Sequence, residues 1–219
     1  MKKIEELQEL LQMENVENVK GRFVEIAKRL FRDFHIEKGE VCYDFLEIEF
    51  YFFSNNHPDT TTYPRDTEAG EWFFHLSGLD IAFKSKKRHE KGKDVNVFGG
   101  GILIRSILKR EEGKEAEVIA GPWRCLCELC KGIMNVTGLS IPLQLVANKK
   151  QDESIDIKDV KWTIRQGITT DKEKIENRKI KQETCYCAYV RNRYHCDSEW
   201  KNANKYYNAK PWERVEVIE

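Results

Sequence analysis

The stretch that decides the fold is Phe45-Leu-Glu-Ile-Glu-Phe-Tyr-Phe-Phe53, a run dense in aromatic and branched side chains that predicts a β-strand. Successive side chains of a strand point to opposite faces of its sheet. One face is apolar and is expected to join the core, and it consists of Leu46, Ile48, Phe50 and Phe52. The opposite face consists of Glu47, Glu49 and Tyr51.

Two carboxylates and a phenol among aromatic rings are unusual for a face that meets only water. A half-buried carboxylate beside rings is how proteins tune a general acid or base and stack a planar ligand. The pattern therefore makes Glu47, Glu49 and Tyr51 candidate site residues. The alternative is that both glutamates face water or pair with lysines on the surface.

Arg105 supports the first interpretation, because it ends the apolar strand Ile102-Leu-Ile-Arg105. A buried arginine needs a carboxylate or phosphate partner, since an unpaired buried charge costs several kcal/mol. Glu49 or Glu47 is the expected partner, and pairing would keep that carboxylate ionised. The preceding Gly99-Gly100-Gly101 lets the backbone pass close to another group, and no Gly-Lys-Ser/Thr of a phosphate-binding loop follows it.

Outward from these strands, the pattern predicts one α+β domain: a curved, mostly antiparallel sheet with N-terminal helices and one internal helix packed on it. Residues 1–39 are assigned to the helices and 40–219 to the core with a basic, aromatic C-terminal segment. Helices are expected within 4–34, capped at Asn15 or Asn18, and at 121–133. Further strands are expected at 72–75, 79–83, 102–107, 141–147, 160–164 and 185–190, and a loop at 84–94.

The chain has 219 residues with 37 basic and 37 acidic side chains, so any binding to nucleic acid must come from local patches. One patch is the basic segment with Lys84, Lys86, Lys87 and Arg88, and a second lies within 191–212. No stretch approaches the ~20 apolar residues of a membrane span. The charged start argues against a secretion signal, and the seven cysteines then indicate reduced thiols and a cytoplasmic location.

Four cysteines, Cys127, Cys130, Cys185 and Cys187, leave open a zinc-stabilised interaction module. Against it, Cys127 and Cys130 fall inside a predicted helix, and buried cysteine is a common small core residue. The polar loop after the first strand offers other binding groups, among them His57 in Asn55-Asn-His-Pro-Asp59.

Taken in order along the chain, these motifs resemble the alkyladenine (3-methyladenine) DNA glycosylase family. Glu47-Ile-Glu-Phe-Tyr51 is similar to that family's Glu-Thr-Glu-Ala-Tyr strand, and Tyr63-Pro-Arg-Asp66 to its Thr-Pro-Arg-Asn. Ile102-Leu-Ile-Arg105 resembles its Val-Leu-Ile-Arg, and Gly121-Pro-Trp-Arg124 its Gly-Pro-x-Lys. Ser77-Gly78 stands where the family has the Tyr-Gly step that wedges into the duplex.

The resemblance implies hydrolysis of the N-glycosidic bond of a flipped, alkylated purine during DNA base-excision repair. It implies that Glu49 activates the attacking water and that Arg105 lies near that water. Tyr51 would stack on the base, and His57, Glu47 and Arg65 would help to bind it. It further implies a monomer that binds DNA and needs no metal or cofactor. A catalytically silent relative that binds nucleic acid or a nucleotide is the alternative on the same fold.

Overall fold

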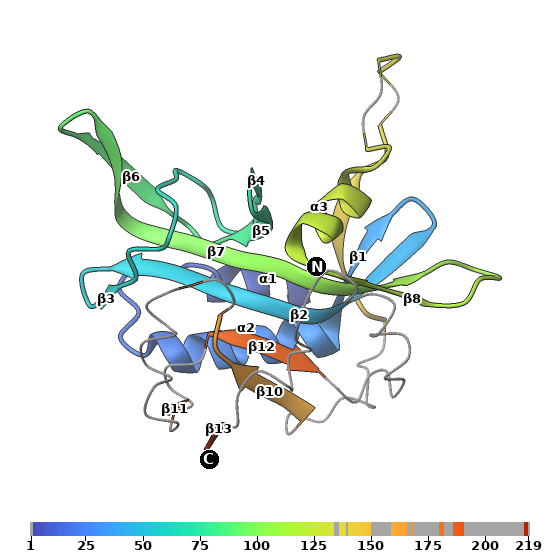
Figure 1. The fold of residues 1–219 in the computed structure, drawn as a ribbon, viewed down its shortest axis with the longest axis horizontal. Coiled ribbons are helices and arrows are strands. Elements are labelled where there is room, and N and C mark those ends of the chain that lie inside the picture. The colour runs from blue at the N-terminus through green and yellow to red at the C-terminus, as the bar shows by residue number, and fades with distance from the viewer. Residues whose placement is uncertain are drawn as a thin grey trace.

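The computed structural model describes residues 2–133, 136–138, 140–149, 159–165, 168, 180–181, 186–190 and 217–218. Within these residues the chain has the expected α+β fold, in which three helices pack with one large, curled antiparallel sheet (Figure 1). The predicted C-terminal patch at 191–212 lies outside the described residues, as do Cys185 and most of the segment 166–185.

Two long strands form the centre of the sheet, β2 (Val41–Ser54) and β7 (Lys93–Arg110), and they pair along most of their length. The outer edge of β2 pairs with β1 (Phe34–Lys38), β12 (Cys187–Val190) and β3 (His57–Pro58). The outer edge of β7 pairs with β6 (Lys86–Glu90), β5 (Gly78–Ala82) and β8 (Glu117–Ala120). Each central strand thus carries three short strands in succession.

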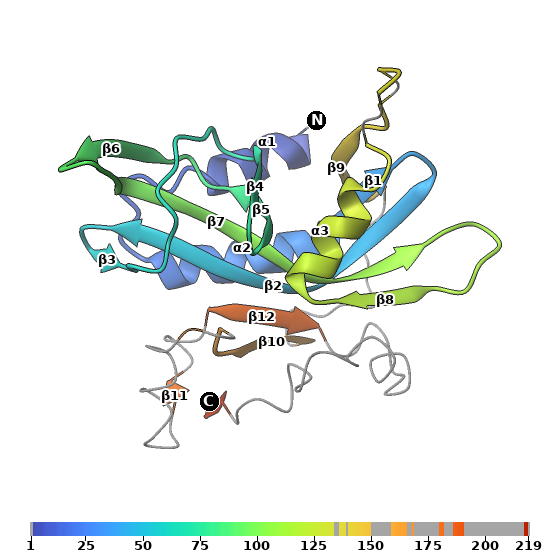
Figure 2. The ribbon, with the colours of Figure 1, turned by 45° about the horizontal axis from the view of Figure 1, so that its top comes forward.

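Three more strands extend the sheet outward. They are β4 (Trp72–His75) beside β5, β9 (Leu143–Ala147) beside β1, and β10 (Val160–Thr163) beside β12. A separate parallel pair consists of β11 (Ile180–Lys181) and β13 (Val217–Ile218). In both ribbon views the β6–β7 hairpin extends beyond one end of the sheet and the β7–β8 hairpin beyond the other (Figures 1 and 2).

The helices are α1 (Lys2–Leu10), α2 (Val19–Asp33) and α3 (Pro122–Cys130). Asn18, one of the two predicted caps, accepts a hydrogen bond from the Gly21 amide at 2.8 Å. In Figure 1, α2 runs alongside the two long strands, and α3 packs beside β5, β7 and β8. None of the helices in the described part of the chain is long and apolar enough to cross a bilayer.

The simple alternation predicted for residues 45–53 is wrong at its start, because the β2–β7 ladder contains two compensating irregularities. Leu46 is an extra residue on β2, and Arg105 is an extra residue on β7. Phe45 therefore joins Ile48, Phe50 and Phe52 in the main core, while Leu46 belongs to a small separate apolar cluster. Each bulge inserts one residue, so the side chains beyond it point to the opposite face from the one that simple alternation predicts. The same irregularity places Arg105 beside the carboxylates.

Aromatic side chains hold α2 to the sheet. The Phe23 ring of α2 stacks on Phe50 at a centroid distance of 4.4 Å and on Phe83 at 6.1 Å. All three rings are fully buried, together with Ile26, Leu30 and Phe31 from the same helix. The spacing of these residues is the 3.6-residue period that predicted the helix.

Two expectations about element boundaries are wrong. The segment 84–94 is a hairpin arm and not a loop, because β6 pairs with the start of β7 from Lys86 to Lys93. Strand structure also begins at Phe34 and not at residue 40, since β1 follows α2 directly. The charged β6 buries no face, so its sequence lacks the apolar alternation that identifies a strand.

Replacing Phe23 by alanine is expected to lower the free energy of unfolding by about 3–5 kcal/mol, because a cavity is left between α2 and the sheet. Urea denaturation monitored by circular dichroism measures this change. The matched control is Leu76→Ala, whose side chain is 92% exposed and whose loss should change stability by less than about 0.5 kcal/mol. Equal midpoints for the two variants would contradict this packing of α2 on the sheet.

Candidate active site

A buried ion cluster lies where β2 and β7 carry their bulges. The Arg105 guanidinium lies 3.2 Å from Glu47 Oε1 through Nε and 3.1 Å from Glu49 Oε2 through Nη1. The pairing predicted for this arginine is therefore confirmed, with both glutamates and not with one. All three side chains are buried, and Glu49 has 0% exposure. The alternative that both glutamates face water is wrong.

The two carboxylates have different surroundings. Glu47 accepts hydrogen bonds from the Ser106 hydroxyl at 2.9 Å and from the Cys187 thiol at 3.3 Å, so neighbouring strands fix both of its oxygens. Glu49 Oε1 accepts a hydrogen bond from the Tyr51 hydroxyl at 2.5 Å. Burial, followed by the Glu49 charge, raises the pKa of Tyr51 far above its usual range, so the phenol stays protonated and donates.

Tyr51 is the member of this cluster that is partly exposed. The Arg165 guanidinium lies over its ring, 4.8 Å from the centroid, and covers one ring face. Arg165 is itself buried and pairs with Asp59 at 2.6 Å. Burial alone would raise the pKa of Asp59, but the nearby Arg165 charge and hydrogen bonds outweigh it and hold that pKa below its usual value.

Arg65 belongs to a neighbouring buried pair. Its Nη1 lies 2.7 Å from Asp80 Oδ2, and the other oxygen of Asp80 lies 2.9 Å from His75 Nε2. A side chain on Gly101, the register partner of Tyr51, would come within 2.8 Å of Arg65 Nη1. Arg65 therefore lies near the Tyr51 region, but its guanidinium is ion-paired with Asp80.

His57 lies away from the carboxylates. Its ring packs on Phe23 and Phe52, which belong to the main core. Its Nδ1 lies 2.7 Å from the Phe52 carbonyl oxygen and its Nε2 lies 2.9 Å from the Tyr186 hydroxyl. Tyr186 in turn lies under the Arg165 guanidinium, so His57 is connected to the cluster through two intervening side chains.

Three of the four candidate phosphate-binding residues lie on β6, and Lys84 lies just before it. Lys84 pairs with Glu68 at 3.2 Å, Lys87 with Asp94 at 2.6 Å and Arg88 with Glu90 at 3.1 Å, while Lys86 is exposed. Pairs at the surface contribute about 0–1 kcal/mol, so a phosphate can replace these partners at little cost.

Three of the four cysteines of the zinc alternative lie in the described part of the chain, and they are not grouped. Cys127 and Cys130 lie on α3, as predicted, while Cys187 lies on β12 and donates to Glu47. In the described part of the chain these three form no cluster of metal-ligating atoms, and Cys185 lies outside it.

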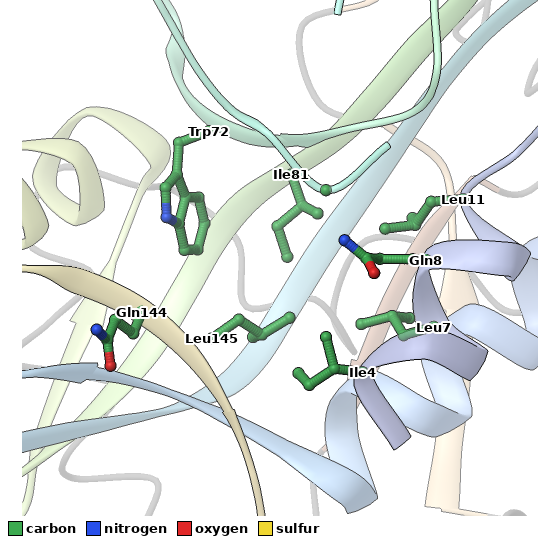
Figure 3. A pocket seen from close by; sticks show the side chains of 9 residues that line it. Ile4, Leu7, Gln8, Leu11, Trp72, Ile81, Gln144 and Leu145 are labelled. Carbon is green, nitrogen blue, oxygen red and sulfur yellow. The ribbon is translucent and has the colours of Figure 1, made fainter. Parts of the chain in front are cut away.

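A separate apolar pocket of about 320 Å³ lies between α1 and the sheet (Figure 3). It is lined by Ile4, Leu7, Gln8, Leu11, Gly70, Trp72, Ile81, Gln144 and Leu145. None of these side chains is titratable, so this pocket offers no acid or base for hydrolysis. The ionisable side chains therefore lie at the carboxylate cluster and not at this pocket.

Sequence reasoning missed Asp80, Asp59 and the role of Arg165. Asp80 had a usable signal, because an acid between Leu79 and Ile81 is as unusual as Arg105 in its own strand. Asp59 and Arg165 are 106 residues apart, and nothing in the local sequence links them.

Comparison with models of protein families, with curated proteins and with solved structures gave no match for this chain. The geometry of its own side chains is therefore the basis for a function.

Replacing Arg105 by methionine is expected to lower the free energy of unfolding by about 3–5 kcal/mol, because two buried carboxylates lose their counter-charge. The double variant Arg105→Met/Glu47→Gln should recover part of this loss, since one uncompensated charge is removed. Denaturant unfolding of the two variants gives both values. If Arg105→Met is as stable as the wild type, the cluster does not carry buried charge as described.

Proposed function

We propose that the protein is an N-glycosylase that releases an alkylated purine base from DNA, with Glu49 as the residue that activates water. The single observation that carries the proposal is the Arg105–Glu49–Tyr51 arrangement in a water-poor part of the sheet. Arg105 and the Tyr51 hydroxyl both contact the Glu49 carboxylate, so a group that can accept a proton is held in one position.

In the proposed reaction, Glu49 takes a proton from water while the water oxygen bonds to the sugar C1′ and the C1′–N bond breaks. The purine leaves with the bonding electron pair, which neutralises the positive charge that alkylation placed on it. Arg105 orients Glu49 and limits its motion, and the partly exposed Tyr51 ring stacks on the extruded base. Glu47 positions Arg105 and does not touch the substrate.

Extrusion of a base leaves a gap in the stack, and an apolar side chain can fill it. Ser77 is too small and polar for this, but its neighbour Leu76 is at the tip of the β4–β5 hairpin with 92% exposure. The same hairpin carries His75 and Asp80, which link it to Arg65 beside the Tyr51 region. Leu76 is therefore the side chain best suited to enter the duplex.

The β6–β7 hairpin is proposed to hold the DNA backbone. From Lys86 to Asp94 it carries five basic side chains and two acidic ones, on an arm that extends beyond the sheet (Figure 1). Because the whole chain has no net charge, this local excess directs the phosphates to one end of the molecule. We further propose a monomer acting in base-excision repair in the cytoplasm.

Replacing Glu49 by glutamine should reduce base release by about 10²–10⁴-fold, because the amide cannot accept the proton. The assay incubates methylated duplex DNA with the protein and counts abasic sites by alkaline strand cleavage. The matched control is Asp44→Asn on the same strand, whose carboxylate pairs with Arg110 at 2.6 Å outside the cluster. Full activity in Glu49→Gln would exclude the assigned role.

Alanine at Lys86, Lys87 and Arg88 together should weaken binding to duplex DNA with little dependence on sequence. The plot of log affinity against log salt should become shallower by about 0.9 for each phosphate that the variant no longer neutralises. Fluorescence anisotropy with a labelled duplex at several salt concentrations measures both effects. Lys114→Ala, in the turn between β7 and β8, serves as the control and should leave the slope unchanged.

One observation favours a second function, which is binding of nucleic acid or a nucleotide without cleavage. Glu49 has 0% exposure, so a substrate reaches it only if its surroundings open. Tight binding of methylated DNA by the wild type, with no abasic sites formed, would favour this second function over hydrolysis.

A further inference from the structure

A second group of polar side chains lies on the β1–β2 hairpin, away from the carboxylate cluster. His35 and Glu37 of β1 and Cys42 of β2 offer one ligand atom each, and these atoms all lie within 4.8 Å of one another. Glu37 and Cys42 are direct register partners across the antiparallel pair, and His35 is two residues from Glu37 on the same face. The fold thus brings a nitrogen, an oxygen and a sulfur together at one place.

The orientation of the His35 ring is fixed by Asn148. Asn148 Nδ2 donates to the Arg32 carbonyl at 2.9 Å, so its Oδ1 must be the atom that faces His35 Nδ1 at 2.6 Å. An amide oxygen only accepts, and His35 Nδ1 therefore carries the hydrogen. In neutral imidazole this leaves the lone pair on Nε2, directed at Glu37.

His35 Nε2 lies 2.9 Å from Glu37 Oε1. Two lone pairs at that distance repel unless a positive species compensates them, either a proton on the imidazole or a metal ion bound by both. A histidine that donates its second ring nitrogen to a fixed oxygen is the usual arrangement of a metal ligand. The thiol of Cys42 beside the same two atoms favours the metal.

We propose that His35, Glu37 and Cys42 bind a divalent transition-metal ion, Zn²⁺ in the first place. Thiolate, imidazole and carboxylate are the ligands that zinc takes in proteins, and their two negative charges match the ion. Bond lengths of 2.0–2.3 Å put tetrahedral ligand atoms about 3.3–3.8 Å apart, so small side-chain adjustments of His35, Glu37 and Cys42 would be needed to close the site around an ion. Glu37 is 39% exposed, so we expect water to supply the fourth ligand.

The bound ion would cross-link the β1–β2 hairpin and, through His35 and Asn148, connect it to the end of α2. The Asn148 backbone amide also donates to the Asp33 carbonyl at 2.8 Å. The position of Asn148 behind His35 therefore does not depend on the metal. The site is independent of base release, because none of its residues contacts Glu47, Glu49 or Arg105 in the interactions described above.

The test is titration of the full chain, stripped of metal by a chelator, with Zn²⁺ in competition with a chromophoric chelator. One equivalent should bind to the wild type, and His35→Ala and Cys42→Ser should each lose it. Asn148→Ala should bind about 10–100-fold more weakly, because the support of His35 is removed. Cys127→Ser is the control, since this exposed thiol on α3 lies outside the site.

Glu37→Gln keeps the test decisive if the other variants fold poorly, because its side chain is 39% exposed and its loss should leave the fold intact. It should weaken zinc binding and reduce the rise in melting temperature that zinc gives the wild type. Co²⁺ in place of Zn²⁺ should produce a thiolate charge-transfer band that Cys42→Ser abolishes and Cys127→Ser retains. Absence of zinc binding by the wild type, or binding that survives both Glu37→Gln and Cys42→Ser, would overturn the site.

Discussion

The contact of Arg105 with Glu47 and Glu49 is the interaction on which the centre of this molecule depends. Burying three charges is costly unless they compensate one another with good geometry. That compensation requires β2 and β7 to be paired in one register, because a shift by a single residue would turn the carboxylates toward the apolar core. The ion cluster thus specifies the pairing of the two central strands of the main sheet.

The paired bulges show how the sheet meets this requirement. Leu46 and Arg105 are inserted on opposite strands, so the ladder resumes in register after them. The apolar face stays continuous from Phe45 to Phe52, while Arg105 reaches the carboxylates from the opposite strand. Bulges near functional sites commonly redirect a side chain in this manner. The same device therefore serves the core and the site at once.

Much of this arrangement could be predicted from the sequence, for physical reasons that differ from residue to residue. The amphipathic period identified α2, and the cost of burying Arg105 alone identified its partners. The bulges could not be predicted, because no glycine stands beside Leu46 or Arg105 to mark the irregularity. The β6 strand was missed because its side chains all meet water. Asp59 and Arg165 are 106 residues apart, and no local sequence pattern links them. The enzymatic role of the site is our proposal.

Asn148 joins parts of the chain that are distant in sequence. Its backbone and side chain hold two carbonyl groups at the end of α2, its amide oxygen faces His35, and its own carbonyl accepts from Lys3 of α1 at 3.1 Å. Local opening of either N-terminal helix must therefore break bonds at the sheet as well. The helices and the β1–β2 hairpin should consequently exchange their amide hydrogens as one cooperative unit rather than fray separately.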